Sequence, residues 1–292
     1  MTILLTGATG FLGSHLLEKL VEENYNVIVL KRSFSDTWRI EHLLGKVKTY
    51  NIDLEDISLP FKEQKIDCVI HTVASYGRSG ETIYEVIDTN LMFSLKLLET
   101  AVFFNTDTFF NTDTLSYKYL NHYALSKKQF VEWLKFFSDK IKVINFKIEH
   151  MYGPKDDKTK FVTWLMEQIL NNKGKIGLTE GKQKRDFIYI DDVVNAYMTV
   201  LEKSGSFQES FKEFDVGTGK QVELKEFITT LYNKLRDRYE VTSELNFGAI
   251  PYRKGEFMEI NEDIEPLFNL GWKPRFSIEE GIAKTIEGLE HE

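Results

Sequence analysis

Thr6-Gly7-Ala8-Thr9-Gly10-Phe11-Leu12-Gly13 is the stretch that decides the fold of this 292-residue chain. The apolar run Thr2–Leu5 comes before it and predicts a short, buried parallel strand. The residues from Ser14 to Glu23 predict an amphipathic helix. Glycines at such a strand-to-helix turn let a pyrophosphate approach the N–H groups at the helix N-terminus. The predicted dinucleotide-binding residues of this turn are Gly7, Thr9, Gly10, Phe11, Leu12 and Gly13.

Composition narrows the class of protein. The length allows one large α/β domain or a domain with a smaller lobe. Hydrophobic residues make up 42% of the chain, and no apolar run reaches the roughly 18 residues of a membrane span. The net charge of −8 argues against a general nucleic-acid binder. Cys68 is the only cysteine, which fits a reducing cytoplasm, and the six histidines form no ligand-spaced metal cluster.

The residues after the second predicted strand, Val27 to Leu30, indicate which cofactor binds. In a dinucleotide fold this strand ends beside the adenosine ribose, where an acidic residue would bind the 2′-hydroxyl. Here the strand ends in Lys31, Arg32 and Ser33, whose two cations and hydroxyl suit a 2′-phosphate. The alternative is an ordinary solvated strand end. Given the glycine turn, we favour NADP(H) over NAD(H), with Asp53-Leu54 after a third strand at Val47–Ile52 beside the adenine.

A fourth strand is predicted from Cys68 to Val73, and its C-terminal end is where ligands bind in parallel sheets. We expect Val73 and Ala74 to line the path of the nicotinamide half. Tyr76 and Arg78 follow in the loop and either reach the substrate or simply decorate the surface. His71 lies inside the strand, so we expect an interior histidine with satisfied hydrogen bonds and no catalytic role.

A tyrosine and a lysine one helical turn apart form the candidate catalytic pair. Tyr123 and Lys127 lie on one face of a helix predicted from Asn121 to Lys140. Chance alone produces about one such pair in a lysine-rich chain, so the position matters more than the spacing. The pair follows a strand predicted from Thr108 to Thr112, with Asp113-Thr114 just past its end. An earlier helix, Thr82–Ala101, carries Asn90, which we expect to brace a neighbouring strand or loop.

Six motifs spread over the chain resemble the extended short-chain dehydrogenase/reductase superfamily, which acts on nucleotide sugars. They are Gly7-Gly10-Gly13, Asp53-Leu54, Tyr123-x-x-x-Lys127, Tyr152-Gly153-Pro154, Arg185-Asp186-Phe187 and Leu270-Gly271-Trp272. Within the superfamily, residues 72–78 and 147–153 most resemble the reductases of CDP-4-keto-3,6-dideoxyglucose. The resemblance implies a Rossmann-type doubly wound parallel sheet with a smaller, mostly C-terminal substrate lobe. We expect an NADP-binding domain at 1–147 and 184–216, and a nucleotide-sugar lobe at 148–183 and 217–292.

The resemblance also implies a role for each candidate residue. Tyr123 would be the general acid/base, and Lys127 would lower the pKa of its phenol and contact the nicotinamide ribose. The hydroxyl that contacts the reacting sugar oxygen belongs to Thr112 or Thr114, a choice that remains open. Arg185 and Arg253 match diphosphate-binding cations, with surface salt bridges as the alternative. The other substrate-binding candidates are Tyr76, Arg78, His150, Lys160 and Phe161.

The expected activity is NADPH-dependent reduction of a nucleotide-linked 4-keto-(di)deoxy sugar. The alternatives are a 4-epimerase with tightly bound NAD(P) and a non-catalytic NADP-sensing protein. Dehydration is not expected, because Asp113-Thr114 stands where the related dehydratases carry an Asp-Glu pair. The nucleotide base, the sugar substituents and the stereochemistry remain open. The resemblance further implies a homodimer joined through the helices at Thr82–Ala101 and Asn121–Lys140.

Overall fold

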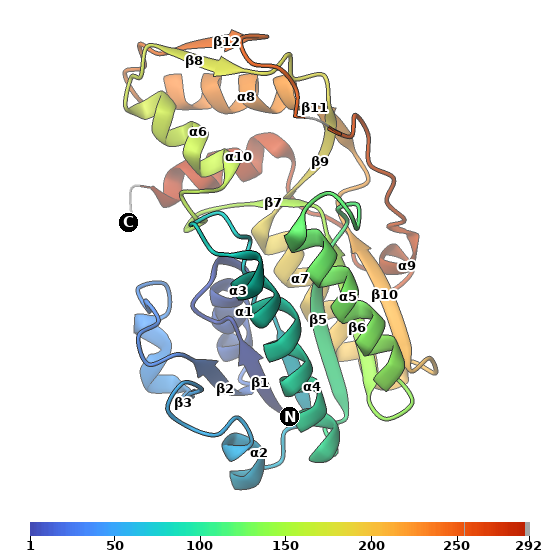
Figure 1. The fold of residues 1–292 in the computed structure, drawn as a ribbon. Coiled ribbons are helices and arrows are strands. Elements are labelled where there is room, and N and C mark those ends of the chain that lie inside the picture. The colour runs from blue at the N-terminus through green and yellow to red at the C-terminus, as the bar shows by residue number, and fades with distance from the viewer. Residues whose placement is uncertain (254, 290–292) are drawn as a thin grey trace. The chain divides into compact units, whose positions relative to one another are not determined.

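The computed structural model describes residues 1–253 and 255–289, and it divides the chain into two compact units (Figure 1). The first unit contains Met1–Ile148 and Val194–Asp215, and the second contains Glu149–Val193 and Val216–Glu292. The expected domain boundaries therefore need one correction, because residues 184–193 belong to the second unit. The reason is that strand β9 (Lys184–Tyr189) pairs with strands β7 and β11 of that unit.

A seven-stranded sheet in the order β10-β6-β5-β4-β1-β2-β3 forms the centre of the first unit. Six neighbouring strands of this sheet, β6-β5-β4-β1-β2-β3, pair in parallel, as the alternating strand and helix pattern predicts. The strands are β1 (Thr2–Thr6), β2 (Asn26–Lys31), β3 (Lys48–Asn51), β4 (Cys68–His71), β5 (Thr108–Thr114), β6 (Lys142–Ile148) and β10 (Phe211–Val216). The strand order steps outward in both directions from β1 and β4, which is the doubly wound arrangement.

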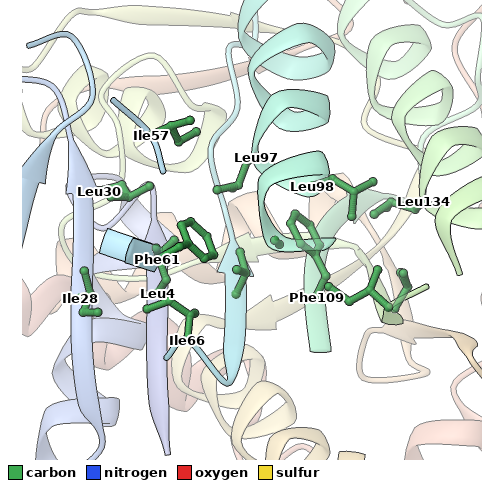
Figure 2. Packing of buried hydrophobic residues seen from close by; sticks show 14 of the residues in the cluster. Leu4, Ile28, Leu30, Ile57, Phe61, Ile66, Leu97, Leu98, Phe109 and Leu134 are labelled. Atoms are coloured by element: carbon green, nitrogen blue, oxygen red, sulfur yellow. The ribbon is translucent and has the colours of Figure 1, made fainter. Parts of the chain in front are cut away.

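Helices pack on both faces of this sheet. The helices of the first unit are α1 (Phe11–Glu22), α2 (Leu59–Glu63), α3 (Ile83–Ile87), α4 (Ser94–Phe103), α5 (His122–Phe137) and most of α7 (Ile190–Lys203), with short 3₁₀ turns η1 (Glu41–Lys46) and η3 (Ser204–Ser206). On one face, Leu97 of α4 and Leu134 of α5 join the buried cluster that includes Leu4 and Phe109 (Figure 2). On the other face, Tyr197 of α7 stacks on Phe146 of β6 with ring centroids 4.0 Å apart.

The helix expected from Thr82 to Ala101 contains a π-helical turn. Helix α3 continues into the turn η2 (Asp88–Phe93), which continues into α4. A capping box at Thr82 and Glu85 starts α3, since each side chain accepts the other's backbone N–H. Asn90, in the π-helical turn, is fully buried. Such turns often mark functional sites, which directs attention to the contacts of Asn90.

The second unit is smaller and contains two small sheets. One has the order β11-β9-β7, and the other pairs β12 with β8. Its elements are β7 (His150–Tyr152), α6 (Phe161–Leu170), β8 (Lys175–Leu178), β9, β11 (Gln221–Glu223), α8 (Leu224–Arg236), β12 (Glu244–Phe247), α9 (Glu265–Phe268) and α10 (Ile278–Gly288). Its core is aromatic: Phe187 of β9 stacks on Phe227 of α8 with ring centroids 3.8 Å apart, and Tyr152 packs edge-on against both. None of the helices described is both long and apolar enough to span a membrane.

Candidate active site

The glycine turn between β1 and α1 is too closely packed to hold a side chain at two of its positions. Gly7 has a φ of +74°, and a Cβ at this position would approach the Val73 backbone nitrogen to 2.9 Å. A Cβ on Gly13 would clash with the Gly7 carbonyl. Both positions therefore require glycine. The predicted residues Phe11 and Leu12 lie in the first turn of α1, and their side chains are buried. An anion at this helix end would therefore be bound by their backbone N–H groups.

Arg39 approaches the same turn and was missed by the sequence analysis. Its guanidinium Nη1 donates to the backbone carbonyl of Thr9 at 3.2 Å and lies over the ring of Trp38. The contact joins residues thirty positions apart, so no local pattern indicates it. It places a cation beside the turn that is predicted to bind a pyrophosphate.

The end of β2 carries both the predicted cations and an anion. Lys31 donates to the Asn51 side chain at 2.9 Å, and Arg32 lies 4.8 Å from the ring centroid of Phe34. The backbone N–H and the hydroxyl of Ser33 both donate to the Asp53 carboxylate, at 2.7 and 2.5 Å. Hydrogen bonding from the Ser33 side chain is the main cause that lowers the pKa of Asp53. A phosphate bound through Ser33 would therefore compete with the Asp53 carboxylate for the hydrogen bonds of Ser33. Leu54, the next predicted cofactor residue, is exposed.

Asn90 fastens the loop after β4 to helix α5. Its side-chain oxygen accepts the Ser75 backbone N–H at 2.7 Å, and its Nδ2 donates to the Ser75 carbonyl and to the Ser126 hydroxyl. This confirms the expectation that Asn90 braces a neighbouring loop. Val73 and Ala74, at the start of this loop, are half-buried. The Asn90 amide thus joins the loop after β4 to the helix that carries Tyr123 and Lys127.

The candidate general acid Tyr123 is covered by aromatic and cationic neighbours. Its ring lies 4.6 Å from that of Tyr76, and the Arg78 guanidinium lies 5.1 Å from the Tyr76 ring centroid. Burial raises the pKa of the Tyr123 phenol well above its usual value, Tyr76 and Asp113 raise it further, and Arg78 opposes them. The expectation of a lowered pKa is therefore wrong for the free chain, because desolvation dominates. The phenol stays protonated, which is the form that a proton donor needs.

Lys127 lies one turn further along α5 and is 1% exposed. Its ammonium nitrogen is buried and has no hydrogen-bond partner among residues 1–253 and 255–289. Burial is the main cause that lowers its pKa to about 8, while Asp113 raises it and Lys128 lowers it. A buried ammonium without a partner is energetically unfavourable unless a ligand supplies acceptors.

Strand β5 extends two residues further than the sequence indicates. Asp113 and Thr114 pair with Lys147 and Ile148 of β6, so the expectation that β5 ends at Thr112 is wrong. Because side chains alternate along a strand, Thr112 and Thr114 share one face and Asp113 faces the other way. The Thr112 hydroxyl contacts the His71 carbonyl at 3.0 Å and the Tyr197 hydroxyl at 2.7 Å. Tyr197 is a second residue that the sequence analysis missed.

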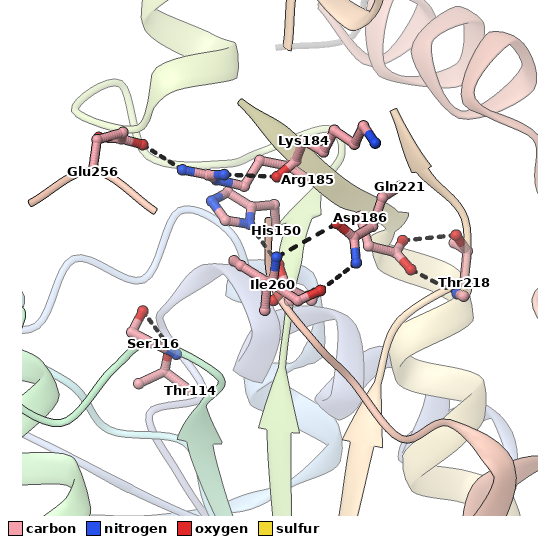
Figure 3. Close-up of polar contacts among 12 residues, drawn as sticks. Thr114, Ser116, His150, Lys184, Arg185, Asp186, Thr218, Gln221, Glu256 and Ile260 are labelled. Carbon is pink, nitrogen blue, oxygen red and sulfur yellow. Dashed lines mark hydrogen bonds and ion pairs between the residues drawn. The ribbon is translucent and has the colours of Figure 1, made fainter. Parts of the chain in front are cut away.

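The two threonines thus differ in their surroundings. The Thr114 hydroxyl exchanges hydrogen bonds with the hydroxyl and backbone N–H of Ser116, in the loop that follows (Figure 3).

His71, as expected, is an interior residue with satisfied hydrogen bonds: its two ring nitrogens contact the hydroxyls of Thr6 and Ser94. Burial lowers its pKa well below the usual value, which keeps the ring neutral.

The remaining predicted substrate residues lie in the second unit. Arg185 is 8% exposed, donates to the Lys184 carbonyl and pairs with the Glu256 carboxylate (Figure 3). Lys160 pairs with the buried Asp156 carboxylate at 3.2 Å. These two cations already have acidic partners, which any bound diphosphate would have to join or displace. The other three residues have exposed surface: His150, which pairs with Glu149 at 2.7 Å, Phe161 and Arg253.

The model of the NAD dependent epimerase/dehydratase family matches residues 3–217. The chain belongs to this family. The family model covers the glycine turn, the whole of β5, and the Tyr123–Lys127 pair. The superfamily expected from the sequence motifs is therefore confirmed, and so is the Rossmann-type fold with a smaller, mostly C-terminal lobe. Among the residues that the structure describes, no three or more histidine, cysteine, aspartate or glutamate side chains are grouped so that they could hold a metal ion.

Two relatives and one solved structure show which known proteins this chain is similar to. The chain is 36% identical to CDP-abequose synthase of Salmonella muenchen, over 99% of this chain and 98% of the relative. It is 27% identical to a putative UDP-glucose 4-epimerase of Methanocaldococcus jannaschii, over 99% and 98%. Its structure resembles the UDP-glucose 4-epimerase of Thermotoga maritima, solved with UDP-glucose, with a TM-score of 0.83, 25% identity, and coverage of 100% and 99%.

Proposed function

We propose that this protein reduces a nucleotide-linked 4-keto-(di)deoxy sugar to the 4-hydroxy sugar with NADPH, in deoxysugar or surface glycan biosynthesis. The observation that carries the proposal is the pair on α5: a protonated, partly exposed Tyr123 one turn from a buried Lys127 ammonium without a hydrogen-bond partner in the described chain. Similarity to CDP-abequose synthase supports the substrate class. A reaction that consumes NADPH also fits the expected cytoplasmic location.

The chain's own residues would divide the work of the reduction. Bound NADPH supplies the hydride to the sugar carbonyl carbon. Tyr123 donates its phenolic proton to the sugar oxygen, and the hydroxyl of Thr112 or Thr114 orients that oxygen. Lys127 binds the nicotinamide ribose and stabilises the phenolate that forms once the proton has left. Arg185 and Arg253 hold the diphosphate, with Lys160, Phe161 and His150 beside the nucleotide sugar.

For the cofactor, Lys31 and Arg32 support NADP(H), with Ser33 as a further donor. Gly7, Gly10 and Gly13 give the pyrophosphate access to the helix N-terminus, and Arg39 adds a cation beside Thr9. Val73 and Ala74 would line the nicotinamide half, and Asp53 with Leu54 the adenine half. Solved members of the fold are complexed with NAD, for example the UDP-glucose 4-epimerase of Thermus thermophilus, so the 2′-phosphate preference is the specific claim for this chain.

Two exposed helical surfaces support the expected homodimer. Aromatic side chains protrude from α3–α4 and from α5, among them Tyr84 at 77%, Phe103 at 78% and Phe136 at 65% exposure. Single exposed apolar residues are ordinary, but several large ones on consecutive helices favour an interface. We therefore propose pairing through these helices. Light scattering on the purified protein should give the mass of a dimer, and Phe103→Glu with Phe136→Glu should give monomers, whereas Phe34→Glu should leave the mass unchanged.

A substrate screen tests the proposed reaction. CDP-, UDP- and dTDP-linked 4-keto-6-deoxy sugars would each be incubated with NADPH, and the products identified by NMR. One NADPH oxidised for each 4-hydroxy product would support the reductase. Product without net NADPH consumption would instead support the epimerase alternative, which the similarity to 4-epimerases favours. Tight NADPH binding with no turnover of any sugar would leave the sensing protein as the function.

A further inference from the structure

A buried carboxylate is bonded to the residue that follows the candidate catalytic lysine on α5. Asp113 is 3% exposed on β5. Its Oδ2 accepts a hydrogen bond from Lys128 of α5 at 2.8 Å and a longer one from the Asn145 side chain at 3.4 Å. Lys128 also donates to the Thr114 carbonyl, so it ties helix α5 to the end of β5. The carboxylate is therefore held in place by groups on β6 and α5.

Three buried atoms on β5 and α5 lack hydrogen-bond partners within the described chain: the Oδ1 oxygens of Asn111 and Asp113, and the ammonium nitrogen of Lys127. Of these, Asp113 carries the negative charge and Lys127 the positive one. The two lysines on α5 also differ in their access to water, since Lys127 is fully buried while the Lys128 side chain is 20% exposed. Opposite charges attract strongly where water is excluded, even without direct contact. Asp113 thus presents an oxygen with no partner in the described chain, on the face of β5 that bonds to the helix of Lys127.

We propose that Asp113, fixed by Lys128 and Asn145, is a positioning residue that keeps Lys127 in its ammonium form and so sets the upper pH limit of the proposed reduction. The inference rests on the proposed function for its catalytic consequence. Asp113 would not touch the substrate itself. It would act through Lys127, from the face of β5 opposite to Thr112 and Thr114.

The other charged groups around Lys127 do not replace this carboxylate. His71 on β4 is neutral and bonded to Thr6 and Ser94. Lys128 on α5 repels Lys127, and Tyr123 on the same helix stays protonated. Lys147 on β6 pairs with Asp215 at 2.6 Å. Glu213 accepts a hydrogen bond at 2.8 Å from the same Asn145 Nδ2 that contacts Asp113. Tyr197 on α7 is kept protonated by burial.

The position of Asp113 separates this role from that of an acid catalyst. An acid that protonates a departing sugar hydroxyl would have to reach the sugar beside the candidate Thr112. The alternation of β5 turns Asp113 toward α5, where it bonds to Lys128. The sequence places Asp113 beside the candidate threonine, and the fold directs its side chain to the helix that carries the candidate lysine.

Direct titration of Lys127 tests the inference independently of turnover. The protein would be labelled with ¹³C at the lysine ε-carbons, and the Lys127 signal would be assigned from the spectrum of Lys127→Met. In the unmodified protein we expect a midpoint at about 8. Asp113→Asn should lower it by about one pH unit or more, because the amide removes the charge but keeps the shape. The control Glu132→Gln, which removes an exposed carboxylate from the same helix, should leave it unchanged.

The opposite change gives a second variant in case Asp113→Asn fails to fold. Lys128→Gln removes a cation that repels Lys127, and the carboxylate of Asp113 remains. The titration midpoint of Lys127 should therefore rise by about half a pH unit or more. An unchanged midpoint in Asp113→Asn, or a fall in Lys128→Gln, would overturn the inference whether or not the protein is a reductase.

The pH profile of kcat/KM then connects the titration to the reaction. In Asp113→Asn the decline at high pH should begin about one unit earlier, with near-normal rates below pH 6.5. A purely structural defect would lower the rate by the same factor at every pH. That outcome would contradict the role of Asp113 even if NADPH is still oxidised. If the unmodified protein oxidises no NADPH, the proposed function fails while the NMR result still decides the inference.

Discussion

The rings of Tyr76 and Tyr123 lie 4.6 Å apart with their planes tilted by 35°. Tyr76 belongs to the loop after β4, and Tyr123 to helix α5. Their contact brings a second phenol, and through it the Arg78 guanidinium, to the candidate proton donor. The two substrate candidates of the first unit, Tyr76 and Arg78, are therefore in one chain of contacts with the candidate proton donor.

Tyr123→Phe should lower turnover by about 10²- to 10⁴-fold, which is the usual effect of removing a positioned general acid. Cofactor affinity should hardly change, because the ring and its packing on Tyr76 remain. Steady-state kinetics and NADPH fluorescence titration measure the two quantities. Near-normal turnover in this variant would show that another group donates the proton.

Tyr76→Ala should raise the substrate KM by about tenfold or more, whereas Tyr76→Phe should have a much smaller effect. The alanine removes the ring that packs between Arg78 and Tyr123, and lost aromatic and cation–π contacts cost about 1–3 kcal/mol together. If both variants keep the normal KM, Tyr76 is a surface residue of the loop and not part of the substrate site.

Replacing Lys31 by Asp and Arg32 by Asn should abolish a preference for NADPH over NADH. Two charge-assisted contacts of about 1.5–3 kcal/mol each are enough for a preference of tenfold or more. Fluorescence titration with both cofactors gives the ratio of the dissociation constants. The matched control is Lys234→Asp with Arg236→Asn on α8. Equal affinities in the unmodified protein would contradict the choice of cofactor.

Asn90→Ala should lower the free energy of unfolding by about 1–3 kcal/mol, because buried polar groups of Ser75 and Ser126 lose their partner. Turnover should fall as well, since Tyr76 and Tyr123 lie on the two segments that this amide joins. Urea unfolding and kinetics measure both effects. Asp88→Ala, an exposed change in the same helical turn, is the control, and equal stability of the two variants would argue against a bracing role for Asn90.

Much of the fold could be predicted because its signals are local. The glycine turn and the strands predicted at Thr2–Leu5 and Val27–Leu30 follow from short patterns, and both strands end within one residue of the predicted bounds. The end of β5 could not be predicted in this way. Asn111-Thr112-Asp113-Thr114 is as polar as a turn, and only pairing with β6, some thirty residues later, makes it a strand.

The candidate site shows the same division. The spacing of Tyr123 and Lys127 indicates a pair, but not the environment that determines its charge. A lysine one turn away suggests a lowered phenol pKa, whereas burial and Asp113 raise it. The contacts of Arg39 with Thr9 and of Tyr197 with Thr112 join residues far apart in sequence. Long-range packing of this kind leaves no trace in local residue spacing.

The π-helical turn at Asp88–Phe93 has a consequence for how the sequence can change. Each residue added to or removed from an α-helix rotates everything beyond it by about 100°. The wider turn absorbs one residue, so deleting one residue here would leave a regular helix with α3 and α4 in their present phase. Val86 before the turn and Leu97 after it, which are both buried, would keep their places in the core. The direction of the Asn90 side chain would change instead, so the extra residue serves the bracing of the loop and not the packing of the helix.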